Sequence, residues 1–440
     1  MGKFKASNYN LSFIHEDKTI VYNSFTDNFI IIEHVLHELF LAATNENDLL
    51  GLKDIHEELF ILFLNNGFII PTTKDEYNEI KKISYLHDFN EENYELIINP
   101  TMNCNFKCWY CYETHIKDSK INDVNKDKII KHIKYVLLDK KNTIKNFSLS
   151  WFGGEPLLYF DSIIKNILEY VHPLMIDNNI SFNSSFTTNG LLISQDILNI
   201  CKKFGVNQFQ ITLDGHRERH NEVRFISKQR GSYDKIIENI KLCIINNFLV
   251  IVRINISEET ITDLLKIIDD FKHINSEKKN NLSFSFHEVW QEEKNLTTDI
   301  SIIVEKFREN GLKSSYKGEQ MATITNSCYA DKLNQATINY NGDVFKCTAR
   351  DFKPSLREGN LDDDGKIIWN ENFQKRMFDS RFSNTSCQSC KILPLCNGGC
   401  SQHRLENLGI DYCIHNFDEN EKLEIIKQKF YTRIANTIIV

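Results

Sequence analysis

Long apolar runs are missing from this 440-residue sequence, and so is any excess of basic residues. The longest apolar stretches, such as Phe60–Leu64, are far shorter than the about 20 residues that a membrane-spanning helix needs. This excludes a membrane protein. The first residues form no apolar stretch like that of a secretory signal, so we expect a cytoplasmic location. The 52 basic residues against 60 acidic ones give a net charge of −8, which argues against nucleic acid as a partner.

Internal repeats and low-complexity tracts are absent as well, and 41% hydrophobic with 25% charged residues is typical of a globular protein. At about 150 residues per domain, the length predicts about three domains. Cysteine, by contrast, is abundant, with twelve residues. In a reducing compartment, clustered thiols indicate metal ligands or reactive groups rather than disulfides. Ten of the twelve fall in two groups, whereas Cys201 and Cys243 stand alone in helical patterns and are interpreted as small buried apolar residues.

The first 88 residues predict a small module of strands and helices. Helical patterns run through Val35–Phe40 and Ile55–Phe63, the second ending at Asn65-Asn66-Gly67. This order is typical of a winged-helix-like fold, which could bind a peptide by adding it to an exposed sheet edge. The alternative is a structural cap. The short β-like segments of this module are predicted at 11–13, 20–22, 29–32 and 68–70.

Residues 89–315 alternate between strand-like and helical patterns. The apolar spacing from Ile129 to Leu137 is about 3.6 residues, as in an amphipathic helix. Six alternations predict an α/β fold with a parallel sheet, curled into a partial (β/α)6 TIM-like barrel, with its chemistry at the carboxyl ends of the strands. The six strands are predicted at 94–99, 147–152, 180–187, 208–213, 249–256 and 282–287.

The last part of the sequence has a different character. Residues 316–420 lose the alternation and gain cysteines, glycines and turns. Such a segment predicts a small, loop-rich module that is held together by metal rather than by a large apolar core. Residues 421–440 predict a closing helix, and nothing in the sequence indicates what it packs against.

Three cysteines lie directly after the first barrel strand, where the site is expected. Cys104, Cys108 and Cys111 have the spacing C-x3-C-x2-C. Three thiolates on one short loop can hold three irons of a [4Fe-4S] cluster and leave the fourth iron without a protein ligand. A closed structural zinc site would need a fourth ligand, for which His115 is the only near candidate.

This loop, with Tyr110 just before its last cysteine, resembles the signature of radical S-adenosylmethionine (SAM) enzymes. Motifs similar to the family's others follow successive strands, at Gly153–Pro156, Thr187–Gly190, Asp214 with Arg224, and Arg253 with Asn255. The resemblance implies that SAM binds the open iron and is cleaved to a radical that abstracts hydrogen from carbon. It also implies that the Glu155 carboxylate receives the SAM ammonium group. The SAM-binding residues that it implies are Tyr110, Gly153, Gly154, Glu155, Pro156, Thr188, Asn189, Arg253 and Asn255.

Seven cysteines near the C-terminus have spacings that resemble those of a SPASM domain, a family that carries two auxiliary iron-sulfur clusters. In place of a fourth cysteine that some relatives supply to the first cluster, this sequence has Asn334. That leaves an open iron, a non-cysteine ligand or a substrate thiolate as alternatives. The gap from Cys390 to Cys396 is too short for two zinc knuckles. The resemblance implies one ligand set of Cys328, Cys347 and Cys400, and a second set of Cys387, Cys390, Cys396 and Cys413.

Enzymes with SPASM domains mostly modify peptides or proteins, so the resemblance implies a maturase of ribosomally made peptides (RiPPs). We expect hydrogen abstraction from a precursor peptide, followed by a thioether or carbon-carbon crosslink, with the peptide's leader bound to the N-terminal module. A flavodoxin- or ferredoxin-type protein is expected to supply electrons. Polar candidates for peptide handling or proton removal are Asp214, Arg224, Arg350 and Asp351.

Two alternatives stay open. One is sulfatase maturation, which forms formylglycine; an aspartate typically follows the cysteine there, whereas Thr348 follows Cys347 in this sequence. The other is a non-catalytic electron carrier or redox sensor, which would not explain the motifs at Gly153–Pro156 and Thr187–Gly190. The sequence does not choose the peptide, the kind of bond, the catalytic base or the oligomeric state.

Overall fold

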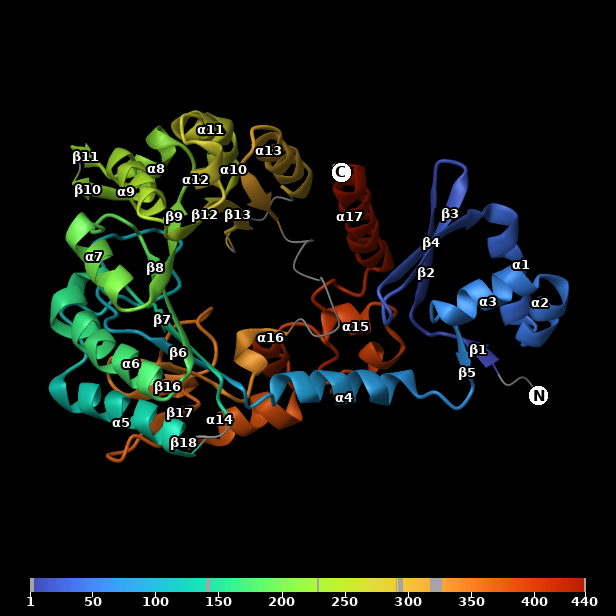
Figure 1. Cartoon of the computed structure of the whole chain (residues 1–440), viewed down its shortest axis with the longest axis horizontal. Coiled ribbons are helices and arrows are strands. Elements are labelled where there is room, and N and C mark those ends of the chain that lie inside the picture. The colour runs from blue at the N-terminus through green and yellow to red at the C-terminus, as the bar shows by residue number, and fades with distance from the viewer. Residues whose placement is uncertain are drawn as a thin grey trace. The chain divides into compact units, whose positions relative to one another are not determined.

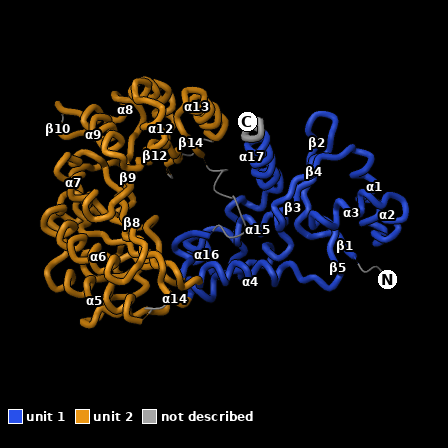
Figure 2. Tube along the Cα trace, viewed as in Figure 1, with its two compact units in different colours: residues 1–89, 318–332, 375–440 blue, residues 90–317, 333–374 orange. Residues whose placement is uncertain are grey.

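The computed structural model describes residues 4–139, 143–227, 229–289, 291, 296–316 and 327–438, the last four of these without their side chains. The chain divides into two compact units, shown in two colours in Figure 2. Unit 1 comprises residues 1–89, 318–332 and 375–440, and unit 2 comprises residues 90–317 and 333–374.

Unit 2 is built on a parallel sheet of six neighbouring strands (Figure 1). Each strand pairs in parallel with the next along the chain, which confirms the predicted partial barrel. Each predicted strand agrees with an observed one to within two residues at either end. The strands are β6 (Asn93–Ile98), β7 (Asn146–Trp151), β8 (Ser181–Thr188), β9 (Val206–Leu213), β12 (Leu249–Ile256) and β13 (Leu282–Glu288).

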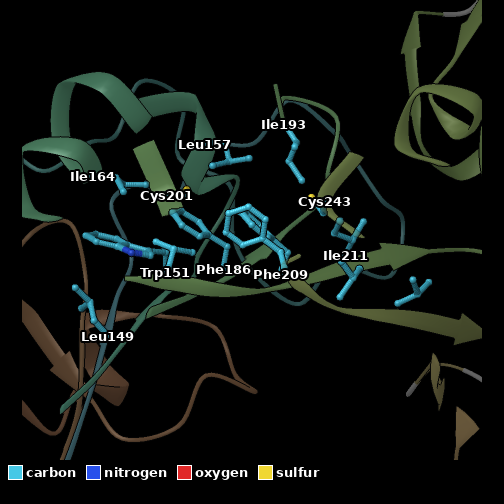
Figure 3. Packing of buried hydrophobic residues seen from close by; sticks show 14 of the residues in the cluster. Leu149, Trp151, Leu157, Ile164, Phe186, Ile193, Cys201, Phe209, Ile211 and Cys243 are labelled. Atoms are coloured by element: carbon cyan, nitrogen blue, oxygen red, sulfur yellow. The ribbon is translucent and has the colours of Figure 1, made fainter. Parts of the chain in front are cut away.

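Helices between the strands bury a continuous apolar core. The rings of Trp151 and Phe186 stack at 6.1 Å, and those of Phe186 and Phe209 stack at 5.4 Å (Figure 3). Cys201 and Cys243 are fully buried in this core, as predicted. The principal helices of the unit are α5 (Asp123–Asp139), α6 (Lys165–Asp177), α7 (Gln195–Lys203), α9 (Tyr233–Ile245) and α13 (Thr297–Glu309).

The sheet of unit 2 extends beyond the six barrel strands at both edges. Next to β13 lies β14 (Lys313–Ser315), and next to β6 lies β15 (Gln335–Ile338), both of them parallel to their neighbours. Three antiparallel strands follow β15, so residues 333–374 of the predicted metal-held module enlarge the barrel sheet. The predicted domain boundaries stay a prediction. The three strands are β16 (Asp343–Phe345), β17 (Gly359–Leu361) and β18 (Ile367–Trp369).

Unit 1 begins with the predicted winged-helix-like elements. A three-stranded antiparallel sheet has the order β2 (Asn10–His15), β3 (Lys18–Asn23) and β4 (Asn28–Glu33). The helix predicted through Ile55–Phe63 is observed at Glu57–Asn65, whereas Ile55 is the last residue of the preceding helix. The two helices are separate because the backbone at His56 is not helical and its ring nitrogen accepts a hydrogen bond from the Leu59 amide. The other elements are α1 (His34–Asn45), α2 (Leu49–Ile55), α3 (Glu57–Asn65), and β1 (Phe4–Ala6), which pairs with β5 (Ile69–Pro71).

Two helices of unit 1 complete the packing around the wing sheet. The closing helix is α17 (Glu419–Ile438), which places Phe430 5.5 Å from the rings of Phe13 and Phe29. Helix α4 (Glu76–Asp88) was not predicted, because its largely polar sequence carries only a narrow apolar stripe around Ile80. None of the described helices combines the length and the apolar character that a membrane crossing requires.

Candidate active site

The three-cysteine loop follows β6 and is fixed at both ends by hydrogen bonds. The Thr101 hydroxyl donates to the Ser119 carbonyl at 2.5 Å and accepts from the Asn103 amide at 2.8 Å. The Ile116 amide donates to the Met102 carbonyl at 3.0 Å. Phe106, in the middle of the loop, is buried in the barrel core and anchors it. The loop therefore holds its cysteines on a rigid frame.

The chemistry of these thiols fits a metal cluster. Burial raises the pKa of Cys104 to about 12 and that of Cys111 to about 11. The thiolate is the form that binds metal, so thiolates at this place require nearby positive charge, which iron would supply. For the alternative of a zinc site, His115 is near enough to Cys111, with 3.5 Å between its Nε2 and the cysteine sulfur. Within the described residues, however, no three potential ligands converge as they would on a single metal ion.

Two glycines bring the end of β7 against the cysteine loop. Gly153 and Gly154 have positive φ values of 75° and 50°. A Cβ on Gly154 would lie 2.3 Å from the carbonyl oxygen of Asn103, closer than any carbon can approach. The Glu155 amide donates to that same carbonyl at 2.9 Å. The glycines of the predicted motif thus allow the segment after β7 to pack closely against the cysteine loop.

Glu155 is fully buried and is bound by protein donors. Its carboxylate accepts hydrogen bonds from the Thr188 hydroxyl and the Asn189 amide, both at 2.8 Å. Burial raises its pKa. The carboxylate joins the ends of β7 and β8 and, like Pro156, does not line the cavity described below. Its predicted contact with the SAM ammonium group stays a prediction.

Tyr110 lies at the centre of a buried polar network that joins three strands' ends. Its hydroxyl donates to Asp214 at 2.5 Å and accepts from Arg224 at 2.7 Å and Asn255 at 3.0 Å. The side-chain amide oxygen Oδ1 of Asn255 in turn accepts from Nε of Arg253 at 3.0 Å. These predicted residues, which are far apart in the sequence, are therefore brought together.

Asp214 and Arg224 form a buried ion pair in that network. Burial by itself would lower the pKa of Arg224, but the charges of Asp214, Tyr110 and Cys108 and the hydrogen bond to Asp214 together outweigh burial and raise that pKa, so the guanidinium stays charged. The Asp214 amide donates to Nδ1 of His220 at 3.3 Å, and Nε2 of His220 lies 3.0 Å from the Ser232 hydroxyl. Burial lowers the pKa of His220 to about 3, so this ring is neutral.

The network and the cysteine loop open onto one cavity of about 190 Å³ in unit 2. Most of the predicted SAM-binding residues line it, together with the three cysteines. Asp214 does not line it, because this side chain lies beneath Tyr110 and Arg224. The predicted residues that line the cavity are Cys104, Cys108, Tyr110, Cys111, Gly153, Gly154, Thr188, Asn189, Arg224, Arg253 and Asn255.

Asp351 and Arg350 do not line the cavity either. The Asp351 carboxylate accepts from the Thr114 amide at 2.9 Å and from its hydroxyl at 2.6 Å. It therefore holds the segment that follows Cys111. The Arg350 guanidinium donates to the carbonyl of its neighbour Ala349 at 2.7 Å. Asp351 thus acts on the segment next to the loop rather than on the cavity.

Two polar residues at the site were not predicted. Glu113 lines the cavity and accepts from the Gly154 amide at 2.7 Å; burial raises its pKa to about 7. Asn99 is fully buried beside Gly153, and within the described residues its side-chain amide has no hydrogen-bond partner. The signal for Asn99 was its place as the last, polar residue of a predicted strand.

Four of the seven C-terminal cysteines gather in unit 1. Burial raises the pKa of Cys396 to about 12, and the nearby thiols of Cys387, Cys390 and Cys413 raise it further. These four form the predicted second ligand set. In the first set, Cys328 and Cys400 belong to unit 1 and Cys347 to unit 2. Asn334 is buried, and its amide donates to the carbonyls of Asn90 and Glu91.

Comparisons with known proteins agree with this geometry. Residues 98–271 match the Radical SAM superfamily, and residues 328–391 match SPASM, an iron-sulfur cluster-binding domain. The radical SAM cyclopropyl synthase TigE of Paramaledivibacter caminithermalis is 22% identical, over 77% of this chain and 75% of that enzyme. The cysteine-type anaerobic sulfatase-maturating enzyme of Clostridium novyi is 24% identical, over 71% of this chain and 89% of that enzyme.

Solved structures share the fold. The enzyme anSMEcpe with bound AdoMet and Cp18Cys peptide has a TM-score of 0.57 and 19% identity, over 79% of this chain and 99% of that chain. Streptococcus suis SuiB bound to its precursor peptide SuiA has a TM-score of 0.51 and 18% identity, over 90% of this chain and 95% of that chain. The chain therefore has a radical SAM domain and an iron-sulfur cluster-binding SPASM domain, which imply [4Fe-4S] clusters and SAM, and it is related to RiPP maturases and sulfatase-maturating enzymes.

Proposed function

We propose that this enzyme matures a ribosomally made precursor peptide by installing a thioether or carbon-carbon crosslink. The observation that carries the proposal is the single cavity at which the three-cysteine loop meets the strand ends of the barrel. The formation of a carbon-carbon bond is supported by TigE, which is a cyclopropyl synthase, and the peptide substrate by SuiB, which is bound to a precursor peptide.

In this proposal Cys104, Cys108 and Cys111 hold the site cluster, and the strand ends around Gly154 and Asn189 hold SAM. These residues would hold the cluster and SAM, which, when bound and reduced, would supply a 5'-deoxyadenosyl radical for hydrogen abstraction from a carbon of the peptide. Arg224 presents a fixed positive charge to the cavity, and Asp214 holds it in place from below. We therefore propose that Arg224 orients the peptide and that Asp214 acts through Arg224 and Tyr110.

Two auxiliary [4Fe-4S] clusters belong to the same proposal. Cys387, Cys390, Cys396 and Cys413 would hold the second of them, and their proximity in unit 1 supports this assignment. The assignment of Cys328, Cys347 and Cys400 to the first rests on the resemblance to SPASM domains and stays a prediction. Asn334 is engaged with backbone carbonyls, which favours a ligand other than Asn334 for the fourth iron. A flavodoxin- or ferredoxin-type protein would supply the electrons.

The leader of the precursor would bind to the wing sheet of unit 1. Strand β3, which contains the predicted segment 20–22, has neighbours on both sides, so an added strand can pair only with β2 or β4. The outer strand β4 contains the predicted segment 29–32 and carries Ile31, which is 55% exposed. Edge strands with exposed apolar residues are suited to strand addition. We propose β4 as the leader-binding edge.

The test is to co-express the enzyme with its precursor peptide under anaerobic conditions and to determine the peptide's mass. Loss of two hydrogens per event is expected, together with 5'-deoxyadenosine. Cys104→Ala should abolish 5'-deoxyadenosine formation, whereas Cys201→Ala, which removes a cysteine from the barrel core, should not. An unchanged peptide beside continuing 5'-deoxyadenosine formation would contradict crosslinking.

Sulfatase maturation is the second candidate, and the likeness to the Clostridium novyi enzyme favours it. Thr348 offers no carboxylate base where that chemistry typically has an aspartate. The Thr348 carbonyl instead accepts from the Tyr112 hydroxyl at 2.9 Å. Incubation with a short sulfatase-type peptide distinguishes the two functions, because formylglycine formation from cysteine or serine would support this candidate over the first.

A further inference from the structure

Tyr9 of unit 1 has a buried hydroxyl with no hydrogen-bond partner within the described residues. Tyr9 is 1% exposed and lies in the segment of the chain between β1 and β2. A buried polar group without a partner is destabilising, and in native proteins it indicates a group or solvent molecule that completes the site. Such a group is therefore expected next to the hydroxyl of Tyr9.

The backbone around Tyr9 is, in contrast, fully engaged. The Tyr9 amide donates to the Ser7 hydroxyl at 3.2 Å, and its carbonyl accepts from the Ser24 amide at 3.1 Å. The buried carboxylate of Glu76, on α4, accepts from the Ser7 hydroxyl at 2.6 Å and from the Asn8 amide at 3.0 Å. These contacts fix the backbone from which the buried ring of Tyr9 extends.

The ring of Tyr9 belongs to a buried cluster that lies against two of the predicted cluster ligands. Tyr9, Ile80 and Leu393 form this cluster, and Cys387 and Cys390 pack against it. Two of the four cysteines of the second ligand set therefore border the cluster that contains the unpartnered hydroxyl.

We propose that the Tyr9 hydroxyl donates a hydrogen bond to a sulfur of the second auxiliary cluster and thereby helps to set its reduction potential. The inference rests on the assignment of that cluster to Cys387, Cys390, Cys396 and Cys413 under the proposed function. A phenol hydroxyl can donate one hydrogen bond, and cluster thiolates and sulfides are acceptors whose hydrogen bonds tune the potential. Tyr9 is a positioning and tuning residue of the N-terminal module, not a cluster ligand.

The main experiment compares wild-type enzyme with Tyr9→Phe, with all clusters reconstituted, in a redox titration followed by electron paramagnetic resonance. Reduction adds negative charge to the cluster, which a donated hydrogen bond stabilises. Tyr9→Phe should therefore shift the potential of the second auxiliary cluster to a more negative value and leave the other clusters unchanged. An unshifted potential with an unchanged spectrum would overturn the inference.

Tyr22→Phe is the matched control. Tyr22 is equally buried in the same module, but its hydroxyl donates to Asp27 at 2.6 Å. Removing this hydroxyl should leave all cluster potentials in place. A shift as large as that of Tyr9→Phe would show that any loosening of the module moves the potential, and would also overturn the inference.

A measurement on the wild-type enzyme covers the case in which Tyr9→Phe does not assemble its clusters. Electron–nuclear double resonance of the reduced second cluster, before and after exchange into deuterated water, should show an exchangeable proton coupled to the cluster. No such proton would contradict the inference. The cluster assignment is tested separately, since Cys387→Ala should lose about four irons per chain; an unchanged iron content would refute the assignment itself.

Discussion

At the scale of single residues, the site depends on groups that are fixed by one another. Tyr110 combines one donated and two accepted hydrogen bonds, which uses the full capacity of its hydroxyl. Asp214 and Arg224 are both buried and paired. Replacing one partner of such a pair leaves a buried charge without compensation, which is far more costly than the loss of an exposed ion pair.

Asp214→Asn is therefore expected to destabilise the enzyme by about 3–5 kcal/mol. Urea unfolding of the two proteins measures the difference. Asp234→Asn provides the control, because the pair of Asp234 with Arg217 is exposed and should contribute less than about 1 kcal/mol. Equal losses in the two variants would show that the Asp214 pair is not buried from water as described.

Gly154→Ala is expected to prevent the cysteine loop from closing against β7, because its Cβ would meet the Asn103 carbonyl. Iron bound per chain and 5'-deoxyadenosine formation should both fall, the latter by at least about tenfold, which corresponds to about 1.4 kcal/mol. Gly409→Ala has the same left-handed backbone but nothing within 4 Å. It should cost only the backbone strain of about 1–2 kcal/mol in stability and leave iron binding intact.

At the scale of elements, the carboxyl ends of the barrel strands form the cavity, whereas the edge strands of the wing sheet form an exposed surface. The carboxyl ends of β6, β7, β8, β9 and β12 surround the cavity, while the outer strands of the wing sheet carry exposed isoleucines. Patterns of apolar residues predicted these strands well, since a period of two or 3.6 is a local property. The two-helix break at His56 and the polar helix α4 were not predictable in this way.

Ile31→Lys should weaken binding of the precursor peptide by about tenfold, because a charged residue blocks strand addition and removes apolar contact area. Fluorescence anisotropy of a labelled leader peptide would measure the dissociation constant. Ile14→Lys makes the same change on β2, where Ile14 is 68% exposed. If Ile14→Lys weakens binding and Ile31→Lys does not, the leader binds to β2 instead of β4.

At the scale of the whole molecule, stability should depend on pH through buried neutral histidines. His132 lies 2.7 Å from the Tyr94 hydroxyl and 2.8 Å from the Gly365 carbonyl. Burial lowers its pKa to about 4, against about 6.5 in the unfolded chain. Between these two pKa values the unfolded state therefore binds more protons than the folded state. The free energy of unfolding is highest above about pH 6.5, and it falls as the pH is lowered toward 4.

The expected loss from His132 at pH 5 is about 2 kcal/mol. Denaturant unfolding at pH 5 and at pH 7.5 would measure it, with His132→Gln as the comparison. His132→Gln should have a lower free energy of unfolding than wild type at pH 7.5. Its free energy of unfolding should, however, fall less between pH 7.5 and pH 5 than that of wild type. His220, with its pKa of about 3, adds to the slope in both proteins. An equal pH dependence of wild type and variant would contradict the assignment to His132.

The sequence by itself determined the alternating barrel, the three-cysteine loop and the order of the motifs, because strand periodicity and short spacings are local properties. Only the tertiary structure decided what those motifs do to one another. In the folded chain, the buried Glu155 carboxylate links the end of β7 to the end of β8 through hydrogen bonds. The buried Asp214 carboxylate accepts hydrogen bonds from Tyr110 and Arg224. The tertiary structure also brought Cys387 and Cys390 against the buried cluster that contains Tyr9. Contacts between residues hundreds of positions apart depend on how the elements pack, and no local pattern contains that information.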